Sequence, residues 1–359
     1  MRQQREGYIL VLTLTITGLL VILGVQIYYL SSGFSSFARI AIKREKAKSL
    51  ALSGIQLTQN QLYVPPQKKE NKNQREVPSQ QGKNQKKEAE VKKEPQKPAE
   101  SQQLILLKQV LPLINRWQKI KFDKKKDGFN GELNTYIACE DGKVHLNNLL
   151  SLMAQKGLTE DRLKSYRDLW LLLGQASDIK KGLYESVVEF FERRNRIWVN
   201  DVTELLIIPS FKVFANKVFV NLPNSEKIPL YLTDIFTPQS RYGKLDPWVL
   251  SVSMQTILGL KSNVLSQDEV GAMLKEFKSS HNWKNDWNRI LKPVYGKDFN
   301  ELPKGIELML SPRFDPGAFS VVSYGVVDDI VQGVYVILGR KAQDDGSILF
   351  GPVKSYWIN

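Results

Sequence analysis

The chain has 359 residues, 42 % of them hydrophobic, so it can bury at least one substantial core. A single cysteine, Cys139, and two histidines exclude an internal disulfide and a Cys/His zinc site. The net charge of +14 suggests a nucleic-acid binder, but it is unevenly distributed. Residues 1–101 hold 17 Lys/Arg against 8 Asp/Glu, whereas residues 102–359 hold 34 against 29. The excess therefore belongs to the N-terminal segment, and we expect no nucleic-acid partner. No phosphate loop, nucleophile elbow or paired-carboxylate motif is visible, so we also expect no enzymatic activity.

An apolar run follows a short basic leader. It extends from Tyr8 to Leu30, and no charged residue follows until Arg39. As a helix, this run is long enough to cross the roughly 30 Å hydrocarbon core of a bilayer. A secretory signal peptide has a shorter apolar region of about 7–15 residues. The sequence therefore predicts a single-pass transmembrane anchor.

Gly7 separates the leader from the apolar run. This order resembles the signal of type IV prepilins and pseudopilins. The resemblance implies that a prepilin peptidase cuts between Gly7 and Tyr8 and leaves the helix as anchor and assembly stalk. Two positions depart from that pattern, because the family most often has Phe or Met where Tyr8 stands and a glutamate where Leu12 stands. Among pseudopilins the missing glutamate is typical of the K-type minor pseudopilin. An ordinary single-pass anchor is the alternative.

The charges that flank the span and the pseudopilin resemblance predict opposite orientations in the membrane. Two basic residues precede the span and five follow it, which by the positive-inside rule favours a cytoplasmic C-terminal domain. The pseudopilin resemblance implies the opposite, an inner-membrane protein whose globular domain is periplasmic. We expect the second orientation, because the rule weakens when a large domain is translocated. The residues are Arg2 and Arg5 before the span, and Arg39, Lys43, Arg44, Lys46 and Lys48 after it.

Helical spacing of apolar residues continues beyond the span to about Leu62, so a helix from Tyr8 would be about 80 Å long. Pro65 and Pro66 end it. The tract over 65–101 is rich in Lys, Gln, Glu and Pro and nearly free of apolar residues, which predicts a disordered linker. An alternative function follows from this linker: a membrane-anchored binding protein whose basic tract contacts anionic lipid or nucleic acid.

In the globular region, periodicity predicts a helix over Leu104–Trp117 and a strand over Leu133–Glu140. Asp141-Gly142 predicts a turn, and Asn147 is suited to cap the next helix. The last 45 residues alternate as antiparallel strands do. Between these parts the pattern is mostly helical. The predicted helices are 148–153, 160–173, 182–194, 202–208, 246–258 and 267–278.

Several motifs resemble the K-type minor pseudopilins of type II secretion systems (general secretion pathway protein K). They are Gly142-Lys-Val-His-Leu-Asn-Asn-Leu149, Val202-Thr-Glu-Leu-Leu-Ile-Ile-Pro-Ser-Phe211, Leu232-Thr-Asp-Ile-Phe-Thr-Pro-Gln-Ser240 with Gly243-Lys-Leu-Asp-Pro247, and the closing strands Phe319–Val327 and Val334–Arg340. The resemblance implies an α+β fold with a pilin-like α/β frame, antiparallel C-terminal strands and an inserted, mostly helical domain. The expected segments are 1–7 leader, 8–64 transmembrane and extended helix, 65–101 linker, 102–147 and 279–359 frame, and 148–278 insertion.

The same resemblance implies a function without catalysis. The chain would be a minor pseudopilin at the tip of the pseudopilus, acting in assembly initiation and protein export. Its partners would be other minor pseudopilins through the N-terminal helix, membrane lipid, and secreted cargo or the outer-membrane channel. The family can also hold calcium, a cation that needs several oxygen ligands. The oxygen-rich loops are Asp123–Glu132, Asp328-Asp329 and Asp344-Asp345, none with EF-hand spacing.

Overall fold

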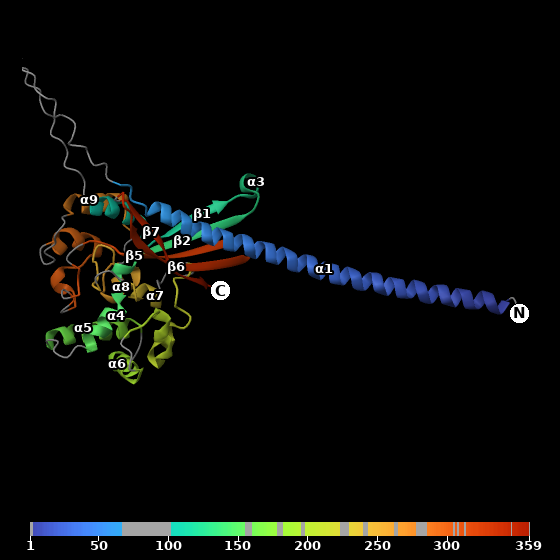
Figure 1. Cartoon of the computed structure of the whole chain (residues 1–359), viewed down its shortest axis with the longest axis horizontal. Coiled ribbons are helices and arrows are strands. Elements are labelled where there is room, and N and C mark those ends of the chain that lie inside the picture. The colour runs from blue at the N-terminus through green and yellow to red at the C-terminus, as the bar shows by residue number, and fades with distance from the viewer. Residues whose placement is uncertain are drawn as a thin grey trace, which may run out of the picture.

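A head and a long helical rod make up the molecule (Figure 1). Helix α1 (Gln3–Gln61) runs unbroken for 59 residues. We call the described residues from 102 onward the head, and the C-terminal part of α1, from Lys43, packs against it. The predicted linker over 65–101 lies outside the described residues apart from Pro65 and Pro66. The computed structural model describes residues 3–66, 102–154, 160–177, 182–194, 198–222, 230–239, 243–261, 265–277, 286–303, 306, 309–311, 314–345 and 347–358.

A five-stranded antiparallel sheet forms the frame of the head, with the order β1-β2-β5-β6-β7. The strands alternate apolar side chains between two faces, as the C-terminal pattern predicts. The C-terminal part of α1 packs across one face, chiefly against β5 and β6. The fold is therefore α+β, as expected. The strands are β1 (Trp117–Phe122), β2 (Gly131–Cys139), β5 (Ala318–Val327), β6 (Ile330–Ala342) and β7 (Ile348–Ile358).

Helices make up most of the described residues between β2 and β5. Strands β3 (Val144–His145) and β4 (Phe236–Thr237) join them in a small parallel pair. The helices are η1 (Glu140–Gly142), α4 (Leu146–Ala154), α5 (Glu160–Ala176), α6 (Leu183–Arg194), η2 (Val202–Ile207), η3 (Pro209–Phe214), α7 (Leu232–Ile235), α8 (Val252–Ile257), α9 (Gln267–Glu276), η4 (Trp287–Leu291), α11 (Lys292–Tyr295) and η5 (Phe299–Glu301). Before the sheet lies α2 (Gln102–Val110), and α3 (Lys124–Asp127) lies in the β1–β2 turn.

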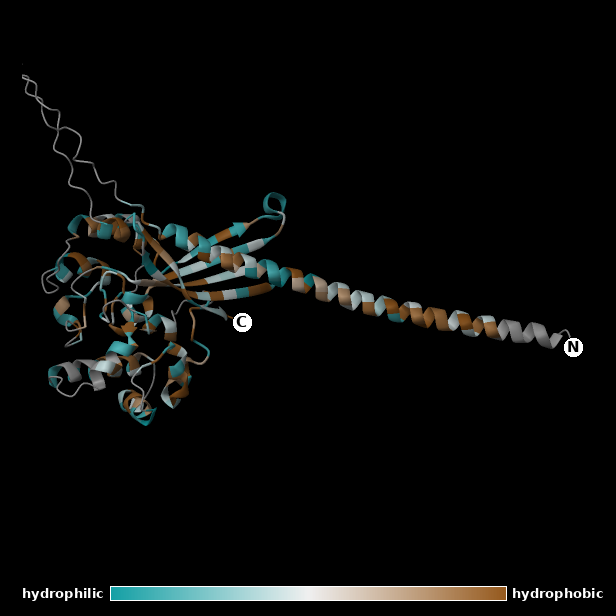
Figure 2. Cartoon of the chain, in the orientation of Figure 1, coloured by the Kyte–Doolittle hydropathy of each residue, from teal (hydrophilic) through white to brown (hydrophobic). Residues whose placement is uncertain are grey.

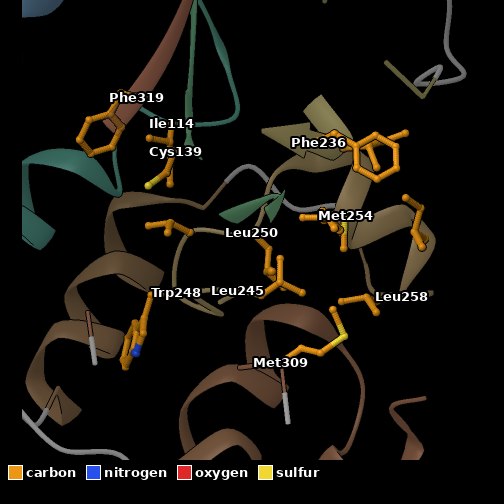
Figure 3. Close-up of a cluster of buried hydrophobic side chains, with 14 of the residues drawn as sticks. Ile114, Cys139, Phe236, Leu245, Trp248, Leu250, Met254, Leu258, Met309 and Phe319 are labelled. Carbon is orange, nitrogen blue, oxygen red and sulfur yellow. The ribbon is translucent and has the colours of Figure 1, made fainter. Parts of the chain in front are cut away.

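One hydrophobic core connects the frame to the helical region. A single buried cluster contains side chains from α1, α2, the sheet and the short helices. Figure 3 shows part of it, in which Cys139 and Phe319 from the sheet lie in the same cluster as Leu250, Met254 and Phe236. The opposite face of the sheet carries a second cluster rich in tyrosine. Because the main core is continuous, the helical region packs as part of the head.

A buried polar network lies at the junction of the frame and the helical region. The ammonium of Lys143, 1 % exposed, donates to a carboxylate oxygen of Glu140, which is fully buried. It also donates to Ser320 Oγ of β5 at 2.6 Å, and Thr237 Oγ1 of β4 donates to the second oxygen of Glu140. Each charge therefore has a partner, as burial requires.

Four predicted elements differ from those in the structure. The helix expected over Leu104–Trp117 ends at Val110, because Pro112 removes a backbone donor and restricts the residue before it, and Trp117 begins β1. The segment 202–208 is a 3₁₀ helix, η2, which Pro209 limits. Only Val252–Ile257 of the predicted helix 246–258 is helical, because Ser251 caps the chain there.

The fourth difference concerns the start of α4. Asn147 does not cap this helix: His145 Nδ1 accepts the backbone N–H of Asn148 at 2.9 Å instead. The side chain of Asn147 bonds both backbone groups of Val199, which ties α4 to the segment before η2. The sequence thus predicted the helix, but α4 begins at Leu146, before the predicted 148, and His145 supplies the cap in place of Asn147.

Removing one charge of the buried pair should destabilise the head strongly. In the detergent-solubilised chain, Lys143→Met should lower the free energy of unfolding by about 3–5 kcal/mol, because Glu140 would stay buried without its cation. The double variant Glu140→Leu/Lys143→Met should cost less than the sum of the two single variants. Urea unfolding followed by tryptophan fluorescence measures this, and additive costs would contradict the pairing.

Candidate anchoring and assembly helix

The N-terminal half of α1 is an exposed apolar rod. Its most apolar 18-residue window has a mean hydropathy of 1.8, and none of that window is buried against the head. Figure 2 shows hydrophobic residues along the rod away from the head. A helix with this length and composition can cross a membrane, and it is not a core helix, which would be buried. Seven large apolar side chains of the rod are each 58–75 % exposed: Leu14, Leu19, Leu20, Tyr28, Leu30, Phe34 and Phe37.

The predicted cleavage residues lie near the start of this rod. Gly7 and Tyr8 are both within α1, which begins at Gln3, so the leader and the anchor form one continuous helix. Leu12, at the position of the missing glutamate, is 47 % exposed and contributes to the apolar surface. The structure thus gives the place of these residues in the fold, and cleavage stays a prediction.

The C-terminal half of α1 is fixed to the sheet by close packing. Ala47 and Ala51 are fully buried. A Cβ added to Gly325 of β5 would lie 2.0 Å from the carbonyl oxygen of Ala47, and one added to Gly54 would lie 2.2 Å from Ser323 Oγ. Two glycines, one on each element, therefore let the helix backbone approach the strand. Periodicity predicts the helix that contains Gly54, whereas nothing in the sequence singled out Gly325.

Two basic residues that follow the span bind the β5–β6 turn. Lys43 Nζ lies 3.1 Å from Asp328 Oδ2 and 3.3 Å from Asp329 Oδ1. The hydrogen bonds that Lys43 donates to these carboxylates raise the pKa of Lys43 and stabilise its charged form. Arg44 Nε donates to Gln332 Oε1 at 3.4 Å. The helix thus exits the sheet beside this turn.

The next two lysines contact aromatic rings of the head. Lys46 Nζ lies 5.9 Å from the ring centre of Phe129, and Lys48 Nζ lies 5.9 Å from that of Trp357. These distances allow cation–π attraction. Among the described residues, Arg39 has no ion pair. Four of the five basic residues that follow the span therefore contact the folded head.

A largely apolar groove of about 570 Å³ runs along α1 where the helix leaves the sheet. Its helix side extends from Ala41 to Ser53, about 18 Å along the axis. Phe129, from the β1–β2 turn, forms the opposite wall. The i,i+4 row from Ala41 through Glu45 to Ser49 and Ser53 contains mainly small residues, which lets a second helix approach closely. The groove is continuous with the exposed apolar rod.

The oxygen-rich loops have other partners. Asp123 caps α3 by accepting the backbone N–H of Lys125 at 2.8 Å. Asp345 accepts the N–H of Ser347 at 2.8 Å. In the described ranges, no three His, Cys, Asp or Glu side chains are grouped so that they could hold a metal ion. The two aspartates of the β5–β6 turn bind Lys43, as described above.

Asp201 connects the last strand to the helical region. It receives a hydrogen bond from Lys354 Nζ at 2.6 Å, one from the backbone N–H of Thr203 at 2.7 Å, and one from the hydroxyl of Tyr356. Burial acts to raise the pKa of Asp201, but these hydrogen bonds outweigh it and hold the pKa below its ordinary value. The carboxylate that begins η2 thus also fixes β7.

Comparisons with known proteins show a remote likeness to a solved structure. No protein-family model matches the chain, and no curated protein sequence matches it. Among solved structures it is similar to a chain of the GspK-GspI-GspJ complex of the type 2 secretion system from enterotoxigenic Escherichia coli. The identity is 14 % and the TM-score 0.37, over 72 % of this chain and 92 % of that one. A similarity of this size does not by itself establish a shared function.

Enlarging the glycine of β5 should loosen the contact between helix and sheet. Gly325→Ala places a methyl group against the backbone of α1, so it should lower the free energy of unfolding by about 1–3 kcal/mol. The matched control is Gly271→Ala in α9, where an added Cβ meets nothing within 4 Å. The control should be neutral or stabilising by up to about 1 kcal/mol. Equal urea midpoints for the two variants would contradict this packing.

Asp201 should make the stability of the head pH-dependent under acid conditions. Its pKa is lower in the folded than in the unfolded chain, where it has the ordinary value near 3.8. The stabilisation that Asp201 contributes is therefore complete at neutral pH. It is lost as the pH falls below 3.8 and through the lower pKa of the folded chain. Asp201→Asn should reduce stability at pH 7 and flatten the acid side of the curve. Asp344→Asn, on an exposed turn, is the control and should leave both unchanged.

Proposed function

We propose that the chain is a minor pseudopilin of a type II secretion system and that it resembles the K-type tip subunit. In this proposal α1 anchors the protein in the inner membrane, the head is periplasmic, and the protein acts in assembly initiation and protein export. It works by positioning and contact, without catalysing a reaction.

One observation carries the proposal: a single helix is both the apolar rod and the inner support of an antiparallel sheet. An anchor joined to a soluble domain through a linker would give independent motion of the two parts. Here the helix leaves the apolar region and continues without a break into the core of the head, where Ala47 and Ala51 are fully buried. The head is therefore rigidly attached to its anchor, as a subunit that assembles through its helix requires.

The leader and the motifs in the sequence agree with this architecture. Gly7 lies between a short basic leader and the apolar rod, and the sequence of motifs from Gly142 to Arg340 resembles that of the K-type subunits. Leu12 takes the place of the glutamate that other pseudopilins use. This fits a tip position, since a tip subunit has no neighbour above it.

The charges after the span oppose this orientation less strongly than their number suggests. Lys43, Arg44, Lys46 and Lys48 each contact the head, so the folded domain accounts for their presence. Without these four, Arg39 alone stands against Arg2 and Arg5 on the other side. The distribution then no longer favours a cytoplasmic head.

The partners follow from the exposed surfaces of α1. We propose that helices of other minor pseudopilins pack along the apolar rod and enter the groove between Ala41 and Ser53. A helix that rises from the same membrane beside α1 would be parallel to it and would meet the groove directly. The broad head would leave no room for another subunit above it and would contact cargo or the outer-membrane channel.

Cleavage of the leader is the test. Co-expression with a prepilin peptidase should shorten the chain so that it begins at Tyr8, as read by intact mass and N-terminal sequencing. Gly7→Ala should block the cut, because the peptidase requires the glycine. Gly18→Ala, which adds a methyl group where nothing lies within 4 Å, is the matched control and should be cut normally.

Orientation provides an independent criterion. In spheroplasts, an added protease should digest the head while the cytoplasmic markers stay intact. Either an uncut N-terminus or a protected head would contradict the proposal, and a protected head would leave a cytoplasmic binding protein as the explanation.

A further inference from the structure

The end of the head that faces the anchor has an excess of positive charge. The β1–β2 and β5–β6 turns lie at the same end of the sheet, since Phe122 pairs with Gly131 and Gly131 pairs with Val327. Helix α1 leaves the sheet at this end, where Lys43 binds the β5–β6 turn. Figure 1 shows α3 and this edge on the side toward the rod. We call this end the proximal edge.

We propose that the proximal edge docks on the anionic phospholipid headgroups of the bilayer that holds α1. Three consecutive lysines of α3, Lys124, Lys125 and Lys126, and Arg39 of the rod would bind lipid phosphates. This inference depends on α1 spanning a membrane and not on cleavage, assembly or secretion.

The charges of the proximal edge divide into paired and unpaired groups. Asp328 and Asp329 bind Lys43, and Glu45 binds Lys48 at 2.8 Å. Asp123 and Asp127 accept backbone N–H groups within the β1–β2 turn, at 2.8 Å each. In the part of the chain that the structure describes, the α3 lysines and Arg39 have no ion pair, and all four are exposed. The charged side chains at this edge are Arg39, Lys43, Arg44, Lys46, Lys48, Lys119, Lys121 and Lys124–Lys126 against Glu45, Asp123, Asp127, Glu132, Asp328 and Asp329, of which Glu132 pairs with Lys119.

The length of the rod places these charges close to the bilayer surface. Residues 7–38 carry no charge and would extend about 48 Å as a helix. A bilayer is about 40–45 Å thick with its headgroups, so an uncharged stretch of this length reaches both headgroup layers. Lys43, the first residue bound to the head, is only about 6 Å further along the helix than Arg39. That distance is within the Debye length of about 8 Å at physiological salt.

The exposed aromatic residues at this level support the same placement. Phe34 and Phe37 are 73 % and 69 % exposed. They lie between the long apolar run and Arg39, and aromatic side chains in such positions commonly lie at the interface between the bilayer and water. An anionic surface is thus the nearest ligand for the α3 lysines, and each lysine near such a surface contributes to binding. An acidic protein surface is the competing occupant.

The test measures how reactive individual lysines are in the full-length chain, reconstituted in nanodiscs with or without phosphatidylglycerol. A water-soluble acetylating reagent and mass spectrometry give a rate for each lysine. Lys124–Lys126 should react about fivefold more slowly in the anionic bilayer than in phosphatidylcholine. The protection should disappear at high salt. Lys212 and Lys275 are exposed on the helical region and serve as internal controls whose rates should not change.

A variant tests whether the three lysines cause the docking. In Lys124→Gln/Lys125→Gln/Lys126→Gln, the nearby exposed Lys121 becomes the reporter and should lose the protection that the anionic bilayer gives it. The change affects only exposed side chains, so folding is expected to be retained, and the urea midpoint checks this. Equal lysine rates in both bilayers, or protection that salt does not relieve, would overturn the proposal and leave an acidic protein as the occupant.

Discussion

The backbone contact between α1 and β5 determines where the other parts of the molecule lie. Gly325 lets the carbonyl oxygen of Ala47 approach to a distance that no side chain would allow, and about two turns further along the helix Gly54 leaves room for the side chain of Ser323. The two contacts fix both the position of the helix along the strand and its rotation about its axis. They therefore also fix the direction of the rod, which side chains line the groove, and the end of the sheet at which α1 exits.

The position of the helical region depends on the sheet, because a buried ion pair and a common apolar core join the two. Lys143 keeps its hydrogen bond to Ser320 of β5, and Glu140 keeps the one from Thr237 of β4, only when both strands lie beside them. Burial raises the pKa of Asp234, and the nearby positive charge of Lys143 opposes this increase. Moving the helical region away from the sheet would leave unpaired charges in the interior, which costs several kcal/mol per ion.

The sequence predicts those features whose physics is local. The rod, the strands β5 and β6, and helices such as α5 and α9 follow from periodicity and caps, and Pro65 and Pro66 indicate where the helix stops. The contacts that join the elements depend on side chains that are far apart in the chain. The parallel pairing of Val144 with Phe236 and the buried lysine are of this kind. Gly325 was one of several glycines in the last strands, and only the tertiary structure shows that α1 lies against it.

The two edges of the sheet limit where a partner can bind. An open edge strand can pair with another chain, unless proline, charge or a bulge interrupts it. On β7, Pro352 lacks a donor, Lys354 carries charge, and the register against β6 shifts between Ile337 and Leu338. On β1, Lys119 and Lys121 alternate along an exposed strand. Strand addition is disfavoured at both edges. The helix packing proposed for the partners uses neither edge, because it takes place along α1, where the groove and the exposed rod are continuous with each other.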